Sequence, residues 1–320
     1  MKIVVLDGRA ENPGDLSWDA FHALGELTVY EAAPCSDAET VQRIGDAEIV
    51  ITNKTPLGRA VLEACPSIRY IGLLSTGTNV CDCAFAARRG IPVCNVPAYS
   101  TAAVAQHTVA LLLEITNAVG LHSSGVHAGK WVRSEDFCYW DQPVTELAGR
   151  TIGILGFGSI GKAVGRIAKA LGMTVLAAGS RPTAEGCAIA EYVSPEELFA
   201  RADVISLNCP LLPETEHIIN AASIAKMRDG VILLNTGRGA LVDERALRDA
   251  LDSGKVAAAG VDVLSEEPMA ADNPLLGAPN CYITPHIAWA AQSCRERVME
   301  VSAENLRGFL TGRPQNVVNL

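Results

Sequence analysis

The sequence lacks the features that define several large classes of protein. Apolar residues make up 49% of the 320 residues, but no run approaches the roughly 18 consecutive apolar residues of a transmembrane helix. It has no basic cluster and a formal net charge of −10, so it offers no concentrated basic face to phosphates. The start, MKIVVLDGRA, predicts a buried strand instead of a signal peptide. We therefore expect a cytoplasmic protein that binds neither membranes nor nucleic acids.

The ten cysteines include no Cys-x-x-Cys pair, the spacing that zinc sites and thiol–disulfide exchange commonly use. The closest two, Cys81 and Cys83, have no histidine nearby at a zinc-ligand spacing. We therefore predict reduced thiols, mostly small buried side chains, and no metal site.

Strand-like and helix-like segments alternate along the chain, which indicates parallel sheets with crossover helices. In the first part of the chain, strands are predicted at 2–7, 27–31, 47–53, 69–75 and 91–94. A further strand is predicted to begin at residue 151. Others are predicted at 173–179, 203–208, 230–236, 257–263 and 281–286. A last helix is predicted at 291–311, before Gly312 and Pro314.

The segment between these two regions has a different character. Residues 101–123 are rich in Ala and Leu and free of proline, which predicts one helix of about five turns or more. The following stretch, 120–150, contains the aromatic residues Trp131, Phe137, Tyr139 and Trp140 between short polar spacers. We expect it to form an extended arm that packs on a second subunit.

A glycine-rich sequence follows the strand that begins at residue 151. Gly156, Gly158 and Gly161 fit the pattern G-x-G-x-x-G, with Ser159 and Ile160 between the last two glycines. Between a strand and a helix, this pattern allows a tight turn and a close approach of the backbone to a pyrophosphate at the helix N-terminus. The sequence therefore predicts a dinucleotide site, with a purely structural turn as the alternative.

The end of the next strand bears on which dinucleotide is bound. NAD sites usually place an acidic residue there to hold the ribose 2′-hydroxyl, whereas this sequence has Gly179, Ser180 and Arg181. A hydroxyl and a guanidinium suit a 2′-phosphate, so NADP(H) is favoured and NAD(H) stays possible. Alternatively, Arg181 is a solvated loop residue.

Three further polar residues each lie at or just after the end of a predicted strand: Arg238, Glu267 and His286. Ligands bind at this edge of an open α/β sheet. Arg suits the binding of a carboxylate, and His beside a carboxylate suits proton transfer to a ketone oxygen. Taken singly, Arg238 could cap a helix, Glu267 could be a surface acid and His286 could lie in the core. The other histidines are expected to be structural or solvent-facing: His22, His107, His122, His127 and His217.

These residues belong to a longer series of motifs through which the sequence resembles the D-isomer-specific 2-hydroxyacid dehydrogenases. The motifs extend over essentially the whole chain, in the order LLSTGTNV, VAQHTVALLLE, GILGFGSIG, NCPLLPET, NTGRG, EEP and PHIAW. The resemblance implies an NAD(P)-dependent enzyme that interconverts a 2-keto acid and a 2-hydroxy acid by hydride transfer.

The resemblance also implies residue roles. Arg238 would bind and polarise the substrate, His286 would be the acid/base, and Glu267 would support His286. The backbone N–H groups of a loop formed by Ser75, Thr76 and Gly77 would meet the substrate carboxylate. The residues implied on the nicotinamide side are Cys209, Pro210, Thr236, Gly237, Asp262 and His286, with Asp262 placed to hold the carboxamide.

The fold class that the resemblance implies is α/β, with two Rossmann-like doubly wound parallel-sheet domains. A flavodoxin-like substrate domain would consist of residues 1–99 and 288–320, and an NAD(P)-binding Rossmann domain of residues 100–287. The latter would include residues 120–150 as a dimerisation arm, giving a homodimer. The glycine-rich sequence near residue 156 agrees with this order, because it lies far from the chain start.

Trp289 and the segment 137–140 resemble the glycerate dehydrogenase and hydroxypyruvate reductase branch, which suggests hydroxypyruvate or glyoxylate as substrate. Packing within the arm explains residues 137–140 equally well. Two alternatives stay open: another 2-hydroxyacid or phosphite dehydrogenase of the same family, and a non-catalytic, dinucleotide-sensing protein like the corepressors of this fold. Those corepressors keep the Arg, Glu and His, so these residues do not decide the question.

Overall fold

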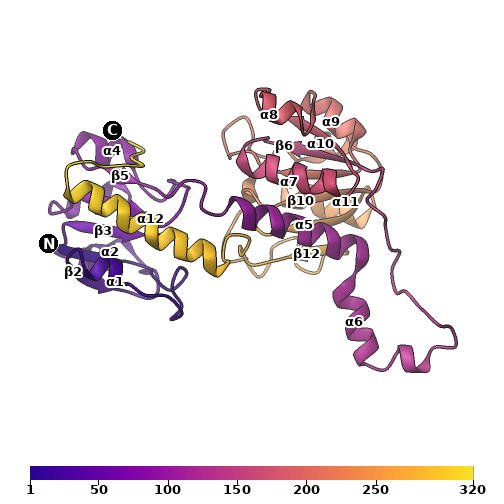
Figure 1. The fold of residues 1–320 in the computed structure, drawn as a ribbon, viewed down its shortest axis with the longest axis horizontal. Coiled ribbons are helices and arrows are strands. Elements are labelled where there is room, and N and C mark those ends of the chain that lie inside the picture. The colour runs from indigo at the N-terminus through magenta and orange to yellow at the C-terminus, as the bar shows by residue number, and fades with distance from the viewer. Residues whose placement is uncertain (320) are drawn as a thin grey trace. The chain divides into compact units, whose positions relative to one another are not determined.

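The computed structural model describes residues 1–319, which form two compact units. Unit 1 consists of Met1–Tyr99 together with the segment that begins at Ala290, and unit 2 is Ser100–Trp289. Figure 1 shows the chain passing from one unit to the other and back again. Each unit is described by itself below.

Unit 1 is built on a five-stranded parallel sheet with the strand order β2-β1-β3-β4-β5. Its strands are β1 (Lys2–Val5), β2 (Glu26–Val29), β3 (Ile49–Thr52), β4 (Tyr70–Leu73) and β5 (Val93–Cys94). Its helices are α1 (Asp19–His22), α2 (Asp37–Ile44), α3 (Arg59–Ala64), α4 (Cys83–Arg88) and α12 (Gln292–Leu310).

The core of unit 1 lies on both faces of its central strands. All residues of β3 and β4 are buried, as expected of parallel strands covered on both sides. Helix α12, drawn in yellow in Figure 1, comes from the far end of the chain and packs against β4. The rings of Tyr70 and Phe309 lie 5.0 Å apart in this contact. Unit 1 is therefore complete only when both ends of the chain are present.

Unit 2 is built on a seven-stranded parallel sheet with the strand order β12-β11-β10-β9-β6-β7-β8. Its strands are β6 (Thr151–Leu155), β7 (Thr174–Ala178), β8 (Glu191–Tyr192), β9 (Val204–Leu207), β10 (Val231–Asn235), β11 (Val256–Val261) and β12 (Cys281–Ile283). Its helices are α5 (Thr101–Asn117), α6 (Val119–His127), η1 (Trp131–Arg133), α7 (Ser159–Ala170), α8 (Ala184–Cys187), α9 (Pro195–Arg201), α10 (Ala221–Lys226), η2 (Gly239–Leu241) and α11 (Glu244–Asp252).

Helices cover both faces of this sheet. One buried cluster joins the strands to α5 and α7, and another joins them to α9, α10 and α11. The strand order reverses between the neighbours β6 and β9, which is the point where ligands bind in doubly wound sheets. The predicted fold class, two Rossmann-like doubly wound parallel-sheet domains, is confirmed.

The prediction of one helix over 101–123 is wrong. Helix α5 ends at Asn117 and α6 begins at Val119, with a bend of 56° between them. Ala118 joins them in a left-handed conformation (φ +48°), and the Glu114 carboxylate accepts a hydrogen bond from the Gly120 N–H. The helices part because α5 is buried in unit 2, whereas α6 has no buried residue.

The arm of residues 120–150 leaves the body of unit 2 through α6 and η1 and then returns (Figure 1). Most of its large apolar side chains are exposed, including Val132 at 88% and Phe137 at 89%, whereas Leu147 near its end is buried. In the part of the chain that is described, no single helix is long and apolar enough to cross a membrane; α5 and α6 reach that length and composition only as a bent pair.

Candidate active site

Three neighbouring strands of unit 2 bring the predicted catalytic residues to one edge of its sheet. Arg238 follows β10, Glu267 follows β11 and His286 follows β12, and these strands lie side by side. Because all three are parallel, their carboxyl ends share one edge. The same edge carries the glycine-rich turn after β6.

His286 and Glu267 are in direct contact. The imidazole Nδ1 lies 2.6 Å from Oε2 of Glu267, and both side chains are partly buried. The other carboxylate oxygen, Oε1, accepts a hydrogen bond of 3.1 Å from the Leu264 N–H, which anchors Glu267 to its own loop. A carboxylate on Nδ1 orients the ring and stabilises the imidazolium form, so Nε2 is the nitrogen available to a ligand.

Arg238 is positioned by the backbone turn after β10. The buried Asn235 side chain donates to the Arg238 carbonyl (2.9 Å) and accepts from the Gly237 N–H (3.1 Å). The guanidinium is exposed and forms no ion pair with any acid among residues 1–319. It is therefore available for an anionic ligand.

Gly239 joins the Arg238 turn to the loop that leads to Glu267. A Cβ atom at this position would lie 1.8 Å from the Leu264 carbonyl carbon, so the two loops are packed backbone to backbone. Any side chain at this position would force them apart and disturb the spacing of Arg238 and Glu267.

Asp262 holds the loop that contains His286. This 1% exposed carboxylate accepts hydrogen bonds of 2.9 Å from the backbone N–H groups of Ile287 and Ala288, and one of 2.6 Å from the Thr284 hydroxyl. Burial alone raises the pKa of Asp262, but hydrogen bonds from His107, Thr284 and the two amides outweigh it and lower the pKa below the ordinary aspartate value. The role in carboxamide binding stays a prediction, and loop positioning is a role that the sequence did not reveal.

Helix α5 supplies two contacts to the same edge that sequence reasoning missed. His107 Nε2 lies 2.9 Å from the Thr284 hydroxyl, and the hydroxyls of Thr108 and Thr236 are 2.8 Å apart. The motif VAQHTVALLLE gave only a helix, because nothing local in it points to partners more than a hundred residues away.

The glycine-rich turn has the shape that a dinucleotide requires. Gly156 has φ +88°, and a Cβ there would lie 2.4 Å from the Cys209 nitrogen, which packs the turn against the loop after β9. At Gly158 a Cβ would meet nothing within 4 Å, and α7 begins here without a side-chain cap. Ser159, Ile160 and Gly161 form the first turn of α7, whose N–H groups have no acceptor within the helix. The residues present therefore fit a bound pyrophosphate.

The loop after β7 lies beside this turn. Gly179 has φ +72°, and the Ser180 hydroxyl accepts a hydrogen bond of 2.7 Å from the Phe157 N–H. Arg181 is exposed and has no acidic partner in the described part of the chain. Across the strand reversal, Cys209 is buried and Pro210 is exposed.

In unit 1, Ser75, Thr76 and Gly77 form a loop after β4. The Ser75 hydroxyl donates to the Gly77 carbonyl (2.8 Å), and the Thr76 hydroxyl donates to the Val96 carbonyl (2.7 Å). The backbone N–H groups of Thr76 and Gly77 donate to no acceptor within residues 1–319. They can therefore receive an anion. Trp289 is the last residue of unit 2 and is partly buried.

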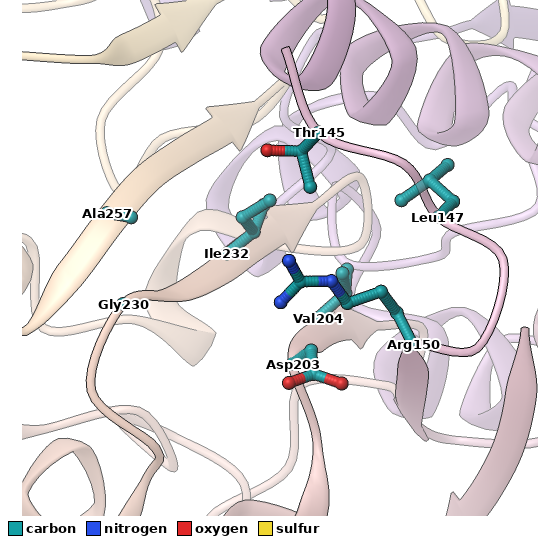
Figure 2. A pocket seen from close by; sticks show the side chains of 8 residues that line it. All are labelled: Thr145, Leu147, Arg150, Asp203, Val204, Gly230, Ile232 and Ala257. Carbon is teal, nitrogen blue, oxygen red and sulfur yellow. The ribbon is translucent and has the colours of Figure 1, made fainter. Parts of the chain in front are cut away.

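A hollow of about 180 Å³ lies at the opposite edge of the unit 2 sheet. Asp203 and Gly230 directly precede β9 and β10, and Arg150 directly precedes β6 (Figure 2). The hollow is thus at the amino ends of the strands, away from Arg238, and we do not assign it to the reaction. In residues 1–319, all ten cysteines are free and no group of three or more metal-ligating side chains occurs.

Comparisons with known proteins identify relatives along the whole chain. The family model described as "D-isomer specific 2-hydroxyacid dehydrogenase, NAD binding domain" matches residues 109–288. A hydroxypyruvate reductase of Blautia hydrogenotrophica is 56% identical and aligns over 100% of both chains. A glycerate dehydrogenase of Methylorubrum extorquens is 38% identical, with 99% of this chain and 98% of the relative aligned. A solved acyclic imino acid reductase in complex with NADPH and D-Arg matches with a TM-score of 0.86 at 29% identity, over 99% of this chain and 100% of that one.

Proposed function

The chain belongs to the D-isomer-specific 2-hydroxyacid dehydrogenase family, and from this premise we propose that it reduces hydroxypyruvate to D-glycerate, with glyoxylate as a second substrate. It is an oxidoreductase that uses a nicotinamide dinucleotide to interconvert a 2-keto acid and a 2-hydroxy acid, as the sequence predicted. The observation that carries the proposal is the 2.6 Å contact of His286 with Glu267 at the sheet edge that Arg238 shares. Similarity to a hydroxypyruvate reductase along the whole chain supports the choice of substrate.

In this proposal, His286 is the acid and base of the reaction. Glu267 occupies Nδ1, so Nε2 gives a proton to the ketone oxygen during reduction and takes it back during oxidation. Glu267 stabilises the imidazolium and keeps the ring in one orientation.

Arg238 binds the substrate carboxylate and polarises the ketone. Its exposed guanidinium has no acidic partner among residues 1–319, and its planar fork matches a carboxylate. The sequence adds Ser75, Thr76, Gly77 and Trp289 to the proposed substrate residues, and the N–H groups of Thr76 and Gly77, which have no acceptor among residues 1–319, suit an anion.

Residues of the glycine-rich turn and the neighbouring loops hold the dinucleotide. When bound, its nicotinamide ring supplies the carbon that gives or takes the hydride. The residues that we assign to this group are Gly156, Gly158, Ser159, Ile160, Gly161, Gly179, Ser180, Arg181, Cys209, Pro210, Thr236, Gly237, Asp262 and His286.

We infer a preference for NADP(H) over NAD(H). No acidic residue ends β7, and the Arg181 guanidinium is free to pair with a 2′-phosphate. The similar imino acid reductase was solved with NADPH. We expect Arg181→Ala to raise the KM for NADPH by about tenfold or more, because a hydrogen bond to a charged group contributes roughly 1.5–3 kcal/mol. The KM for NADH serves as the control and should stay nearly unchanged; a parent enzyme that prefers NADH would contradict the inference.

A matrix of 2-keto acids against NADPH and NADH tests the substrate. We expect the highest kcat/KM for hydroxypyruvate, a lower value for glyoxylate, and lower values for pyruvate and for branched keto acids. A protein that binds NADPH but oxidises it with none of these acids would contradict the proposal and would favour a dinucleotide-sensing role.

We also propose a homodimer, in which the arm buries its exposed apolar side chains against a second copy. Val132, Phe137 and Trp140 are all exposed on the arm. Light scattering coupled to gel filtration tests this, and a monomer at micromolar concentration would contradict it. A cytoplasmic location stays a prediction, which cell fractionation tests.

A further inference from the structure

Two consecutive residues of α5 reach the two loops that carry Arg238 and His286. The Thr108 hydroxyl contacts that of Thr236, two residues before Arg238. His107 Nε2 contacts the Thr284 hydroxyl, two residues before His286. One buried helix therefore touches both loops with adjacent side chains.

The direction of the hydrogen bonds at Thr284 can be assigned. Its hydroxyl has one proton, which it donates to Oδ1 of Asp262 over 2.6 Å. Toward His107 the same oxygen must act as acceptor, so His107 Nε2 carries a proton and donates it. The Asp262 Oδ1 atom lies 3.5 Å from the same nitrogen. His107 is thus the first donor in a chain that runs through Thr284 to the buried carboxylate.

From Asp262 the chain continues into the backbone around His286. Its carboxylate accepts from the N–H groups of residues 287 and 288, and its carbonyl accepts from the His286 N–H over 2.8 Å. His286 has φ +54°, a left-handed conformation that costs a non-glycine residue roughly 1–2 kcal/mol. Such a conformation persists only where surrounding contacts hold it.

We propose that His107 is a positioning residue for His286, acting through Thr284 and Asp262. This inference rests on the proposed role of His286 in proton transfer. His107 does not touch the reacting atoms; it fixes the hydroxyl that orients Asp262, and Asp262 fixes the strained backbone of the loop. A looser loop would let the imidazole swing away from Glu267 and from the substrate oxygen, at little cost to carboxylate binding by Arg238.

The test compares two variants at position 107. His107→Leu keeps the bulk and removes the donor, and we expect kcat to fall about tenfold or more, since small misplacements of a reacting group can cost up to about a hundredfold. The KM for hydroxypyruvate should change less than about twofold. His107→Gln keeps an N–H donor at a similar distance and should recover at least about half of kcat. An equal loss in both variants, or no loss in either, would overturn the proposal.

Thr116→Val is a matched control on the same helix. The Thr116 hydroxyl is buried and bonds only within α5, to the Leu112 and Leu113 carbonyls and the Asn117 side chain. Its loss should lower the unfolding temperature without changing kcat. If Thr116→Val lowers kcat as much as His107→Leu, helix stability explains the result and the proposal fails.

Thr284→Val gives an independent route if His107→Leu does not fold. It should by itself lower kcat about tenfold or more, and a parental kcat would overturn the proposal. Where His107→Leu folds, combining the two changes should cause little further loss, because both break one chain of contacts. Additive losses would contradict the proposal. His286→Ala distinguishes a failure of the proposed function from a failure of the present inference. If His286→Ala keeps full turnover, the proposed function fails. If His286→Ala is inactive and His107→Leu is fully active, only the positioning role of His107 fails.

Discussion

The two units hold a loop in place by the same means, a buried aspartate just beyond the end of a parallel strand. In unit 1, Asp7 follows β1 and accepts hydrogen bonds from the N–H groups of residues 53–55, which follow the neighbouring strand β3. In unit 2, Asp262 follows β11 and accepts from those of residues 287 and 288, beyond the neighbouring strand β12. Both units therefore fix the backbone at the edge where ligands bind.

The groups beside the two aspartates differ. Next to Asp7 lies Glu11, which is 0% exposed and has an Oε2 atom without a hydrogen-bond partner. Its burial, and then the charge of Asp7, raise the pKa of Glu11 well above the ordinary value. Next to Asp262 lies His107, whose Nε2 atom is 3.5 Å from Oδ1 of the aspartate. In unit 1 the aspartate thus has a second buried acid beside it, whereas in unit 2 the neighbour of the aspartate is an imidazole, and the loop that the aspartate holds contains the strained His286.

The largest effect should come from removing the residue that the unit 2 loop holds. We expect His286→Ala to lower kcat by roughly 100- to 10,000-fold, the usual contribution of a general acid or base. Since its side chain is partly exposed, the unfolding temperature should change little. Steady-state kinetics measures kcat and calorimetry measures the unfolding temperature. A variant with parental kcat would show that the loop held in unit 2 carries no residue needed for the reaction.

Replacing Asp262 and Asp7 by asparagine, one at a time, shows whether the two loops serve activity or stability. Asp262→Asn should lower kcat about 10- to 100-fold, because the loop that carries His286 loses its anchor. Asp7→Asn should act mainly on stability and lower the free energy of unfolding by about 1–3 kcal/mol, the cost of leaving buried donors unsatisfied. Urea unfolding and turnover at saturating substrate distinguish them. Equal losses of kcat in both variants would mean that the loops serve the same purpose.

The smallest effect is in the dependence of stability on pH, and its sign differs between the units. The raised pKa of Glu11 means that unit 1 loses stability as pH rises from about 4.3, the ordinary glutamate value, toward the raised one. The lowered pKa of Asp262 means that its ionised form stabilises unit 2 above pH about 3.9, the ordinary aspartate pKa. This stabilisation is lost as the pH falls below that value toward the lowered pKa. We expect Glu11→Gln to raise the unfolding temperature of unit 1 by about 2–4 °C at pH 8 and by less near pH 4. A shift that is independent of pH would show that Glu11 ionises as it does in the unfolded chain.

Much of the fold follows from local patterns in the sequence. Runs such as IVIT in β3 and VILLN in β10 are apolar because their strands are buried, and G-x-G-x-x-G marks a turn that needs glycine to approach the loop after β9. Arg238, Glu267 and His286 could be named because each follows a predicted strand and each lies in a motif of the family that the sequence resembles; parallel strands then bring their ends together. The contact of Glu267 with His286 is a consequence of that geometry.

Contacts between distant segments could not be predicted in this way. His107 and Thr284 are 177 residues apart, and neither stands out in its own segment. The break of the helix at Ala118 has no proline to signal it, and the nearest glycine, Gly120, lies within α6; the break arises because α5 packs in the core of unit 2 while α6 has no buried residue. The positioning role of Asp262 depends on a loop that begins 22 residues later. These features depend on tertiary packing, which local patterns do not encode.

The return of the chain to unit 1 through α12 sets the order in which the protein can fold on the ribosome. Between Tyr99 and Ala290 lie the 190 residues of unit 2 (289 − 99), all of which are synthesised before α12. At about 5–20 residues per second this takes roughly 10–40 s, during which Tyr70 lacks the cover of Phe309. Unit 1 therefore cannot be completed before unit 2 has been synthesised. Until then the apolar sheet face that α12 later covers stays exposed, and a chaperone that binds apolar segments would act at this stage.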